Sequence, residues 1–123
     1  MESKNYGDFN SKYCDRTKIL AIAICKEFNS PQTKESLRVI VRQIIRSATS
    51  VAANFRAAVR ARSRAEYYSK ICIVVEECDE TLFWLEILKD GDLYAQERIT
   101  KMMAETSELL KIFSITKKKL RDK

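Results

Sequence analysis

Five arginines recur along residues 34–62 at spacings that place them on one side of an expected helix. At about 100° per residue they fall within a sector roughly 80° wide, centred about 125° from the apolar positions. A guanidinium group forms paired hydrogen bonds with phosphate or carboxylate and stays charged at physiological pH. The sequence therefore predicts a displayed anion-binding surface, here called the arginine face, which consists of Arg38, Arg42, Arg46, Arg56 and Arg60.

Arg62 and Arg64 continue this basic surface around an expected turn near residues 61–63. Arginines one helical turn apart can follow the phosphate backbone of a nucleic acid. The same side chains can instead form salt bridges with an acidic helix of a neighbouring subunit, or simply be solvated. The sequence leaves these three interpretations open.

Four amphipathic segments joined by short connections make up most of the chain. Apolar residues recur at steps of three and four, which is typical of helices with one buried face. We expect helices over residues 12–28, 32–61, 64–89 and 93–120. Two glycines and one proline in 123 residues leave little room for hairpins, and the length fits one domain over residues 1–123. The expected fold is all-α, an antiparallel up-down-up-down four-helix bundle.

The expected helix ends have local signals. Ser30 and Pro31 would begin the second helix as its cap and its first residue. Ser63 and Glu66 have the spacing of a capping box for the third helix, in which each satisfies the other's exposed amide. Gly91 would end that helix in a left-handed conformation, and the next residue, an aspartate, would cap the last helix. Residues 1–11 are polar, and we expect them to be loose.

The buried faces are expected to be aliphatic and aromatic. The inward positions are Tyr13, Leu20, Ala23, Ile24 and Phe28 in the first helix; Leu37, Val41, Ile44, Ala48, Val51, Ala52, Phe55 and Val59 in the second; Ile71, Val75, Cys78, Leu82 and Leu85 in the third; and Ile99, Met103, Leu109, Leu110, Phe113 and Leu120 in the last. Asn54 lies in mid-helix, where it either bonds to a neighbouring helix or is exposed.

Charge is divided between the two central helices. Residues 34–62 contain seven Lys or Arg against one Asp or Glu, whereas residues 63–90 contain three against seven. We expect these helices to lie antiparallel, with opposite charges available for contacts within or between subunits.

Catalytic and metal-binding groups are sparse. The chain has no histidine, and its four cysteines form no C-x-x-C pair. Cys72 and Cys78 lie among apolar residues, where cysteine behaves as a small hydrophobe. Glu76 and Glu80 are one turn apart and suggest a carboxylate metal site, although a charged face that pairs with arginines explains them as well. We expect no enzyme activity, no resident metal and no cofactor.

The aromatic pairs at residues 67–68 and 83–84 cannot all point into one core, because adjacent helical residues differ in direction by about 100°. One member of each pair must point sideways, towards either a subunit interface or the rim of the bundle. The interface candidates are Tyr67, Phe83 and Trp84. No apolar run is long enough for a membrane span, and the N-terminus lacks the apolar core of a signal peptide, so we expect a cytoplasmic protein without membrane contact.

Three blocks in order give the chain a family resemblance. They are Ser47-Ala-Thr-Ser-Val-Ala-Ala-Asn-Phe-Arg-Ala-Ala, Arg60-Ala-Arg-Ser-Arg-Ala-Glu and Glu76-Glu-Cys-Asp-Glu-Thr-Leu-Phe-Trp-Leu-Glu. From about Leu37 to Tyr94 the chain resembles the bacterial 23S rRNA intervening-sequence proteins. It departs from members with an Asn-Ile-Ala-Glu-Gly segment, because Phe55-Arg-Ala-Ala follows Asn54 here.

The resemblance implies a left-handed four-helix bundle that assembles as a homopentameric ring. Some members are encoded in segments inserted into 23S rRNA genes, and related accessory proteins of diversity-generating retroelements work with RNA and a reverse transcriptase. It implies no catalytic residues. Two hypotheses follow: a ring that binds RNA or other nucleic acid through the arginine face, or an oligomeric adaptor for another protein, such as a reverse transcriptase, whose arginines serve subunit contacts.

Overall fold

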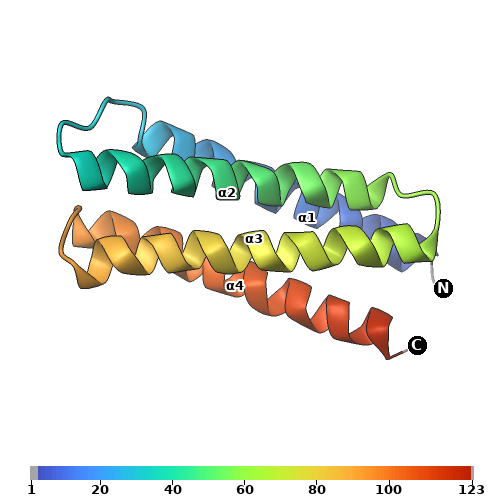
Figure 1. Cartoon of the computed structure of the whole chain (residues 1–123). Helices are drawn as coiled ribbons and strands as arrows, with labels where there is room; N and C mark the ends of the chain where they lie inside the picture. The colour runs from blue at the N-terminus through green and yellow to red at the C-terminus, as the bar shows by residue number, and fades with distance from the viewer. Residues whose placement is uncertain (1–2, 123) are drawn as a thin grey trace.

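The computed structural model describes residues 3–122, and the side chains from residue 7 onward. This part of the chain contains four α-helices and no strand: α1 (Ser3–Glu27), α2 (Glu35–Val59), α3 (Arg64–Asp90) and α4 (Gln96–Arg121). Consecutive helices pack against each other, and both termini lie at the same end of the bundle (Figure 1). The prediction of an all-α, four-helix architecture is confirmed.

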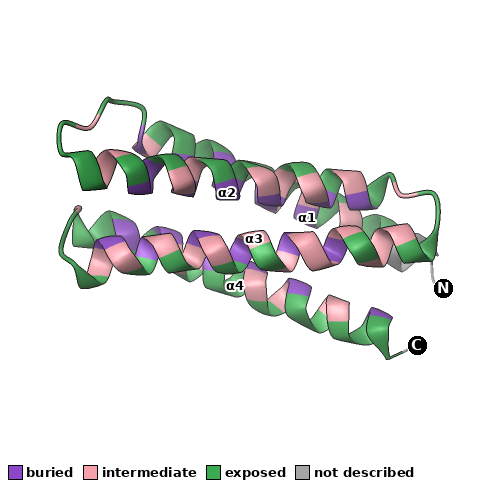
Figure 2. Ribbon diagram, in the orientation of Figure 1, coloured by how far each residue is buried: buried purple, intermediate pink, exposed green. Residues whose placement is uncertain are grey.

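One apolar core joins the four helices, and the buried residues face inward along their whole length (Figure 2). Phe55 of α2 and Phe113 of α4 are fully buried, with ring centroids 5.0 Å apart. Tyr13 of α1 packs on Phe113 at 5.8 Å. These rings connect three helices, and burial of such large side chains is the main stabilising contribution.

Polar contacts fix how the helices lie against one another. The buried hydroxyl of Thr81 in α3 donates to that of Ser47 in α2 at 2.7 Å. Between α1 and α4, Arg16 binds Glu105 with two hydrogen bonds of 2.8 and 3.1 Å. Buried hydroxyls that are paired avoid the cost of desolvation, and their geometry selects one register between α2 and α3.

The first helix begins much earlier than predicted. Residues 3–11, expected to be loose, belong to α1, and only residues 1–2 of that segment lie outside the described part. Phe9 packs on Tyr13 at 4.7 Å and on Phe55 at 6.2 Å, so the apolar face of α1 extends one turn further towards the N-terminus. Tertiary packing thus overrides the polar composition of this segment.

The predicted start of the second helix at Ser30 and Pro31 is wrong. Residues 29–34 form the connection from α1, and α2 begins at Glu35 after an extended Lys34. The amide of Arg38 bonds to the carbonyl of Lys34 at 3.0 Å. A glutamate in the first turn favours this start electrostatically, because the N-terminus of a helix carries partial positive charge.

The capping box at the start of α3 is confirmed in part. The Ser63 hydroxyl accepts a hydrogen bond from the Glu66 amide at 3.0 Å, as predicted. The Glu66 carboxylate, however, accepts from the amide of Arg62 at 2.8 Å rather than from Ser63. The turn between α2 and α3 is therefore fixed by two hydrogen bonds of Glu66, one through its amide and one through its carboxylate.

The junction between α3 and α4 also differs from the prediction. Gly91 is right-handed, with φ −85°, and the left-handed residue is Asp92, with φ 53°. The amide of Leu93 bonds to the Leu88 carbonyl at 2.9 Å and that of Asp92 to Lys89 at 3.1 Å, which is the Schellman pattern. Asp92 therefore ends α3 instead of capping α4, which begins at Gln96.

Most inward positions are buried as predicted, but six are only half-buried and two are exposed. The half-buried residues are Leu37, Ala52, Val75, Leu82, Met103 and Leu110. Ala23 is exposed and Ala21 is buried in its place, whereas Val59 is 37% exposed next to a buried Ala58. Neither interpretation of Asn54 is correct, because its amide is half-buried and donates to the carbonyl and hydroxyl oxygens of Ser50 at 3.0 and 2.9 Å. The side chain bonds to its own helix, one turn back.

Truncation of Phe55 tests the core. We expect Phe55→Ala to lower the free energy of unfolding by about 3–5 kcal/mol, because a fully buried ring leaves a cavity. The matched control, Val59→Ala on the exposed side of the same helix, should change it by less than about 0.5 kcal/mol. Urea unfolding at fixed protein concentration measures both, and equal losses would contradict this description of α2.

Candidate nucleic-acid interface

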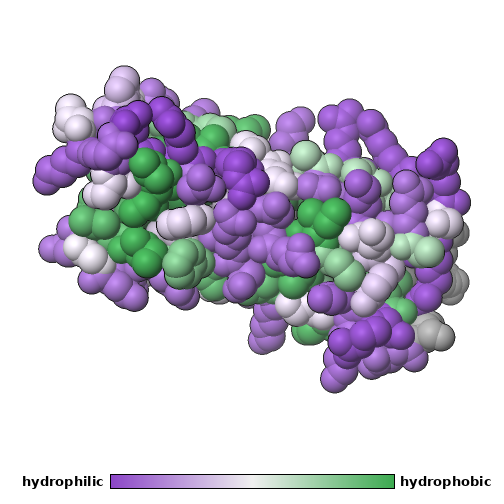
Figure 3. Space-filling model, in the orientation of Figure 1, coloured by the Kyte–Doolittle hydropathy of each residue, from purple (hydrophilic) through white to green (hydrophobic). Residues whose placement is uncertain are grey.

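The arginine face lies on the outer surface of α2, opposite its buried residues. Arg42, Arg56 and Arg60 are exposed, and none of the three forms an ion pair with another described residue. Seen from the side of α2 and α3, hydrophilic side chains cover most of the surface of the molecule (Figure 3). Three guanidinium groups are thus available to an acidic partner.

The two remaining arginines of the face are engaged within the subunit. Arg38 pairs with Glu35, one turn away. Arg46 donates to Glu80 of α3 at 2.7 Å and lies 3.9 Å from Glu77. The pKa of the Glu80 carboxyl lies below its ordinary value because it accepts hydrogen bonds from the indole of Trp84 and from Arg46. Salt bridging between the basic and acidic helices therefore occurs, but inside one subunit.

The electrostatic field of Arg56 and Arg60 reaches the neighbouring helix α1. Burial and the carboxylate of Asp15 raise the pKa of the Cys14 thiol, and the two arginines oppose that rise. This places them near the seam between α2 and α1, towards the end of the bundle that holds both termini. Within the arginine face, Arg38 and Arg46 thus pair with carboxylates, whereas Arg42, Arg56 and Arg60 pair with none of the described ones.

The two turn arginines lie in different surroundings, and their part in a basic surface continuous with the arginine face stays a prediction. Arg62 has a side chain 90% exposed and lies 3.6 Å from Glu66. Arg64 reaches across to α4 and donates to the carbonyl of Leu120 at 3.0 Å. Because the last carbonyls of a helix lack partners within the helix, this contact satisfies one of them and attaches α4 to α3.

The two glutamates considered as a metal site, Glu76 and Glu80, lie in different surroundings. Glu76 is exposed, while Glu80 is turned towards Arg46 and Trp84. Among the described residues, no group of three or more His, Cys, Asp or Glu side chains has an arrangement suited to a metal ion. Cys78 is buried, and desolvation raises the pKa of its thiol to about 12, so it remains a protonated apolar group.

The three aromatic interface candidates occupy different environments. Phe83 is 49% exposed, with its ring 5.0 Å from that of Trp84. Trp84 and Tyr67 are half-buried, and the Tyr67 hydroxyl donates to Asn10 of α1 at 3.3 Å. Of the three, Phe83 exposes the largest fraction of its surface. That these residues contribute to a subunit contact stays a prediction.

Sequence reasoning missed an apolar surface on α1. Ile19 is 65% exposed and Ile22 is 45% exposed, although both belong to an apolar run. Ile19 and Ile22 are three residues apart and lie on a different side of the helix from the buried Leu20 and Ile24. This spacing was the signal in the sequence that could have revealed a second apolar surface. Within the described residues, none of the helices combines the length and apolar composition that a membrane span requires.

Comparison with known proteins gives the chain a family. The model of the family described as "23S rRNA-intervening sequence protein" matches residues 10–114. A crystal structure of a protein of unknown function from the S23 ribosomal protein family of Bacteroides thetaiotaomicron is 30% identical, with a TM-score of 0.77. That match covers 85% of this chain and 97% of the other. No curated protein matches the chain.

Acid titration tests the contact between α2 and α3. The folded pKa of Glu80 lies below its unfolded value, ordinarily about 4.3. Its stabilising contribution is therefore fully present above about pH 5 and is lost as the pH falls through the folded pKa. We expect Glu80→Gln to be less stable than wild type at pH 7 and to lose less stability between about pH 5 and 3.

Thermal unfolding across that pH range, with Glu86→Gln as a control on an exposed carboxylate of the same helix, measures the difference. Plots of melting temperature against pH that run parallel for wild type and Glu80→Gln would show that the contact between Glu80 and Arg46 does not contribute to stability.

Proposed function

Because this chain belongs to the family of 23S rRNA-intervening sequence proteins, we propose that it is a non-enzymatic protein that binds RNA through the arginine face of α2. The proposal includes its assembly, as up-down-up-down bundles arranged in a homopentameric ring in the cytoplasm. A ring would repeat the same basic surface around its axis, which raises avidity for a long polyanion without any new contact.

The observation that carries this proposal is that three of the five arginines of the arginine face are unpaired. Arg42, Arg56 and Arg60 are exposed and form no ion pair with a described residue, although the adjacent helix α3 is acidic. Arginines that only serve to hold this subunit together would be expected to behave as Arg46 does. Unpaired guanidinium groups on one face suit phosphates, which they bind in bidentate fashion.

Binding of this kind is mainly electrostatic. Phosphate contacts position a nucleic acid without reading its sequence, and they release counterions, so affinity falls steeply with salt. We therefore expect weak sequence preference and strong salt dependence.

An oligomeric adaptor that binds another protein, such as a reverse transcriptase, is the second candidate. It is favoured by the apolar side chains that remain exposed on all four helices. The largest are Ile19 and Ile22 of α1, Phe83 of α3 and Ile115 of α4. Exposed apolar surface of this kind is common at protein interfaces, and in this alternative the arginines mainly form contacts between subunits.

Charge reversal on α2 separates the two candidates. We expect Arg42→Glu/Arg56→Glu to lower RNA affinity at least tenfold and to reduce the slope of log affinity against log salt by about one to two units, as two lost phosphate contacts require. The control, Lys26→Glu/Lys101→Glu, makes the same change in net charge at exposed positions of α1 and α4 and should have a much smaller effect. Fluorescence anisotropy with labelled RNA at two salt concentrations measures both.

Light scattering on the same proteins completes the comparison. An α2 variant that keeps its assembly state but loses RNA supports the proposal. Unchanged RNA binding removes the arginine face from RNA recognition, and dissociation into monomers supports the adaptor alternative.

A further inference from the structure

A groove of about 310 Å³ lies on the surface where α1 meets α2. It is lined mainly by Lys18, Ala21, Ile22, Cys25 and Lys26 of α1 and by Thr49 of α2. Ile22 is 45% exposed, and the Thr49 hydroxyl donates to two carbonyls of its own helix, at 2.7 and 3.1 Å. Aliphatic side chains therefore dominate the groove, and the two exposed lysines give it a basic rim.

The outer surface of α3 has the opposite charge and an apolar side chain that projects from it. Phe83 is 49% exposed, and exposed carboxylates lie one or two helical turns from it along the helix. None of these carboxylates forms an ion pair with another described residue. They belong to Glu76, Asp79, Glu86 and Asp90. An aromatic ring with an acidic surround thus matches an apolar groove with a basic rim.

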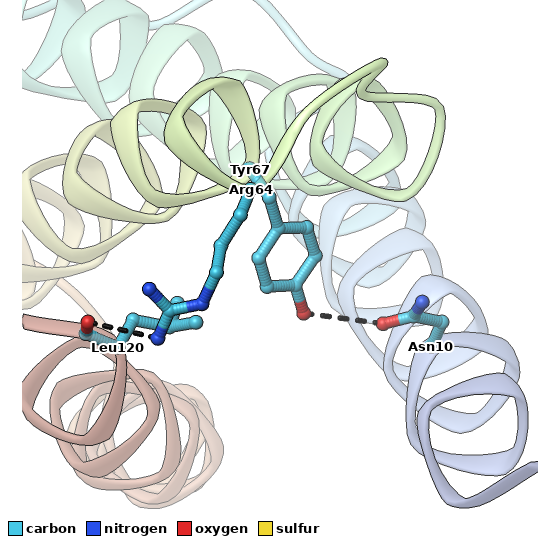
Figure 4. A pocket seen from close by; sticks show the side chains of 4 residues that line it. All are labelled: Asn10, Arg64, Tyr67 and Leu120. Carbon is cyan, nitrogen blue, oxygen red and sulfur yellow. Dashed lines mark hydrogen bonds between the residues drawn. The ribbon is translucent and has the colours of Figure 1, made fainter. Parts of the chain in front are cut away.

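Phe83 differs in its contacts from the residues near the start of the same helix. Figure 4 shows Arg64 and Tyr67 pointing from α3 towards α4 and α1 of their own subunit, where Arg64 bonds to the Leu120 carbonyl and Tyr67 to Asn10. The ring of Phe83 instead packs on Trp84, the next residue of α3, with centroids 5.0 Å apart. Half of its surface remains open to another molecule.

The groove and Phe83 lie at a similar height along the bundle axis. The Thr81 hydroxyl of α3 donates to that of Ser47 in α2, which places these two residues side by side. Thr49 and Phe83 each lie two residues from this pair. At about 1.5 Å per helical residue, Thr49 and Phe83 are therefore separated along the axis by at most about 6 Å, roughly one helical turn.

The two surfaces also lie on different sides of the subunit. α1 and α3 each pack against both α2 and α4, which places α1 and α3 at opposite corners of the bundle. Phe83 therefore cannot reach the groove of its own subunit, whereas Phe83 of a second copy standing alongside can. A contact between two different surfaces repeats from copy to copy, and it can close into a ring when successive copies are not displaced along the axis.

We propose that the groove between α1 and α2 receives Phe83 of a second copy of this chain, with the carboxylates around that ring facing the lysines of the rim. Enclosure of the ring supplies most of the affinity, while exposed rim charges orient the partner and contribute little. Complementarity of charge and height selects a second copy as the occupant. The inference rests on the assembly in the proposed function, gives it a contact, and does not depend on RNA binding.

Disruption of each surface tests the contact. We expect Phe83→Ser and Ile22→Glu each to raise the dissociation constant of assembly at least about tenfold, because one removes the inserted ring and the other places a carboxylate opposite the acidic surface. The matched controls are Ile115→Ser, at a position 47% exposed on α4, and Ile19→Glu, at a position 65% exposed on α1 outside the groove. Both should assemble as wild type does. Sedimentation velocity over a range of protein concentrations measures assembly, and circular dichroism checks the helix content.

A mixture of the two variants gives the sharper result. Phe83→Ser keeps an intact groove, and Ile22→Glu keeps an intact Phe83, so one copy of each can form a single normal contact. We expect a complex of one copy of each variant and no larger species, because the other two surfaces of that complex are both disrupted. A variant that failed to fold would not pair in this way.

The outcomes separate this inference from the proposed function. Dissociation of both variants, normal assembly of both controls and pairing in the mixture support it. Normal assembly of either variant, equal dissociation of a control, or a mixture that does not pair overturns the groove contact and leaves the ring and RNA binding in place. Wild type that is monomeric at every concentration overturns the contact and the ring together. Loss of the proposed RNA binding, measured by anisotropy, leaves the contact unaffected.

Discussion

Burial of one face of α2 is the constraint on which the rest of the molecule depends. Ile44, Val51 and Phe55 are almost completely enclosed, and the ring of Phe55 packs against that of Phe113 of α4. Because helical side chains keep fixed angular relations, enclosing these residues directs the arginines of α2 away from the core. Any rotation of α2 that buried an arginine would have to remove its charge from water, at a cost of several kcal/mol.

The acidic helix α3 then compensates only part of the arginine face. Glu77 and Glu80 of α3 lie beside the middle of α2 and bind Arg46. Further towards its N-terminus, α3 lies beside the C-terminal half of α2, and residues 64–75 of α3 contain a single carboxylate, that of Glu66. Charge is thus compensated towards one end of the bundle and left uncompensated at the other. Under the proposed function, this polarity would draw a polyanion towards the end where the two termini lie.

Much of this could be predicted from the sequence, because α2 has a strong three-and-four periodicity and its arginines share one side. Helix boundaries were harder to predict, because tertiary contacts can override the local sequence signals for helix ends. Phe9 lies in a polar segment, yet it extends α1 because it reaches Phe55. Asp92 has the composition of a helix cap but adopts the left-handed conformation that ends α3. The bond from Arg64 to the Leu120 carbonyl joins residues that are far apart in sequence, so periodicity within one helix cannot reveal it.

Ultraviolet crosslinking of the wild-type protein to RNA, followed by mass spectrometry of the linked peptides, tests the central claim most directly. Our account predicts crosslinks concentrated in peptides from α2, with the segment around Arg56 and Arg60 foremost. Crosslinks concentrated at the opposite end, around Tyr94 and the loop at residues 29–34, would contradict it.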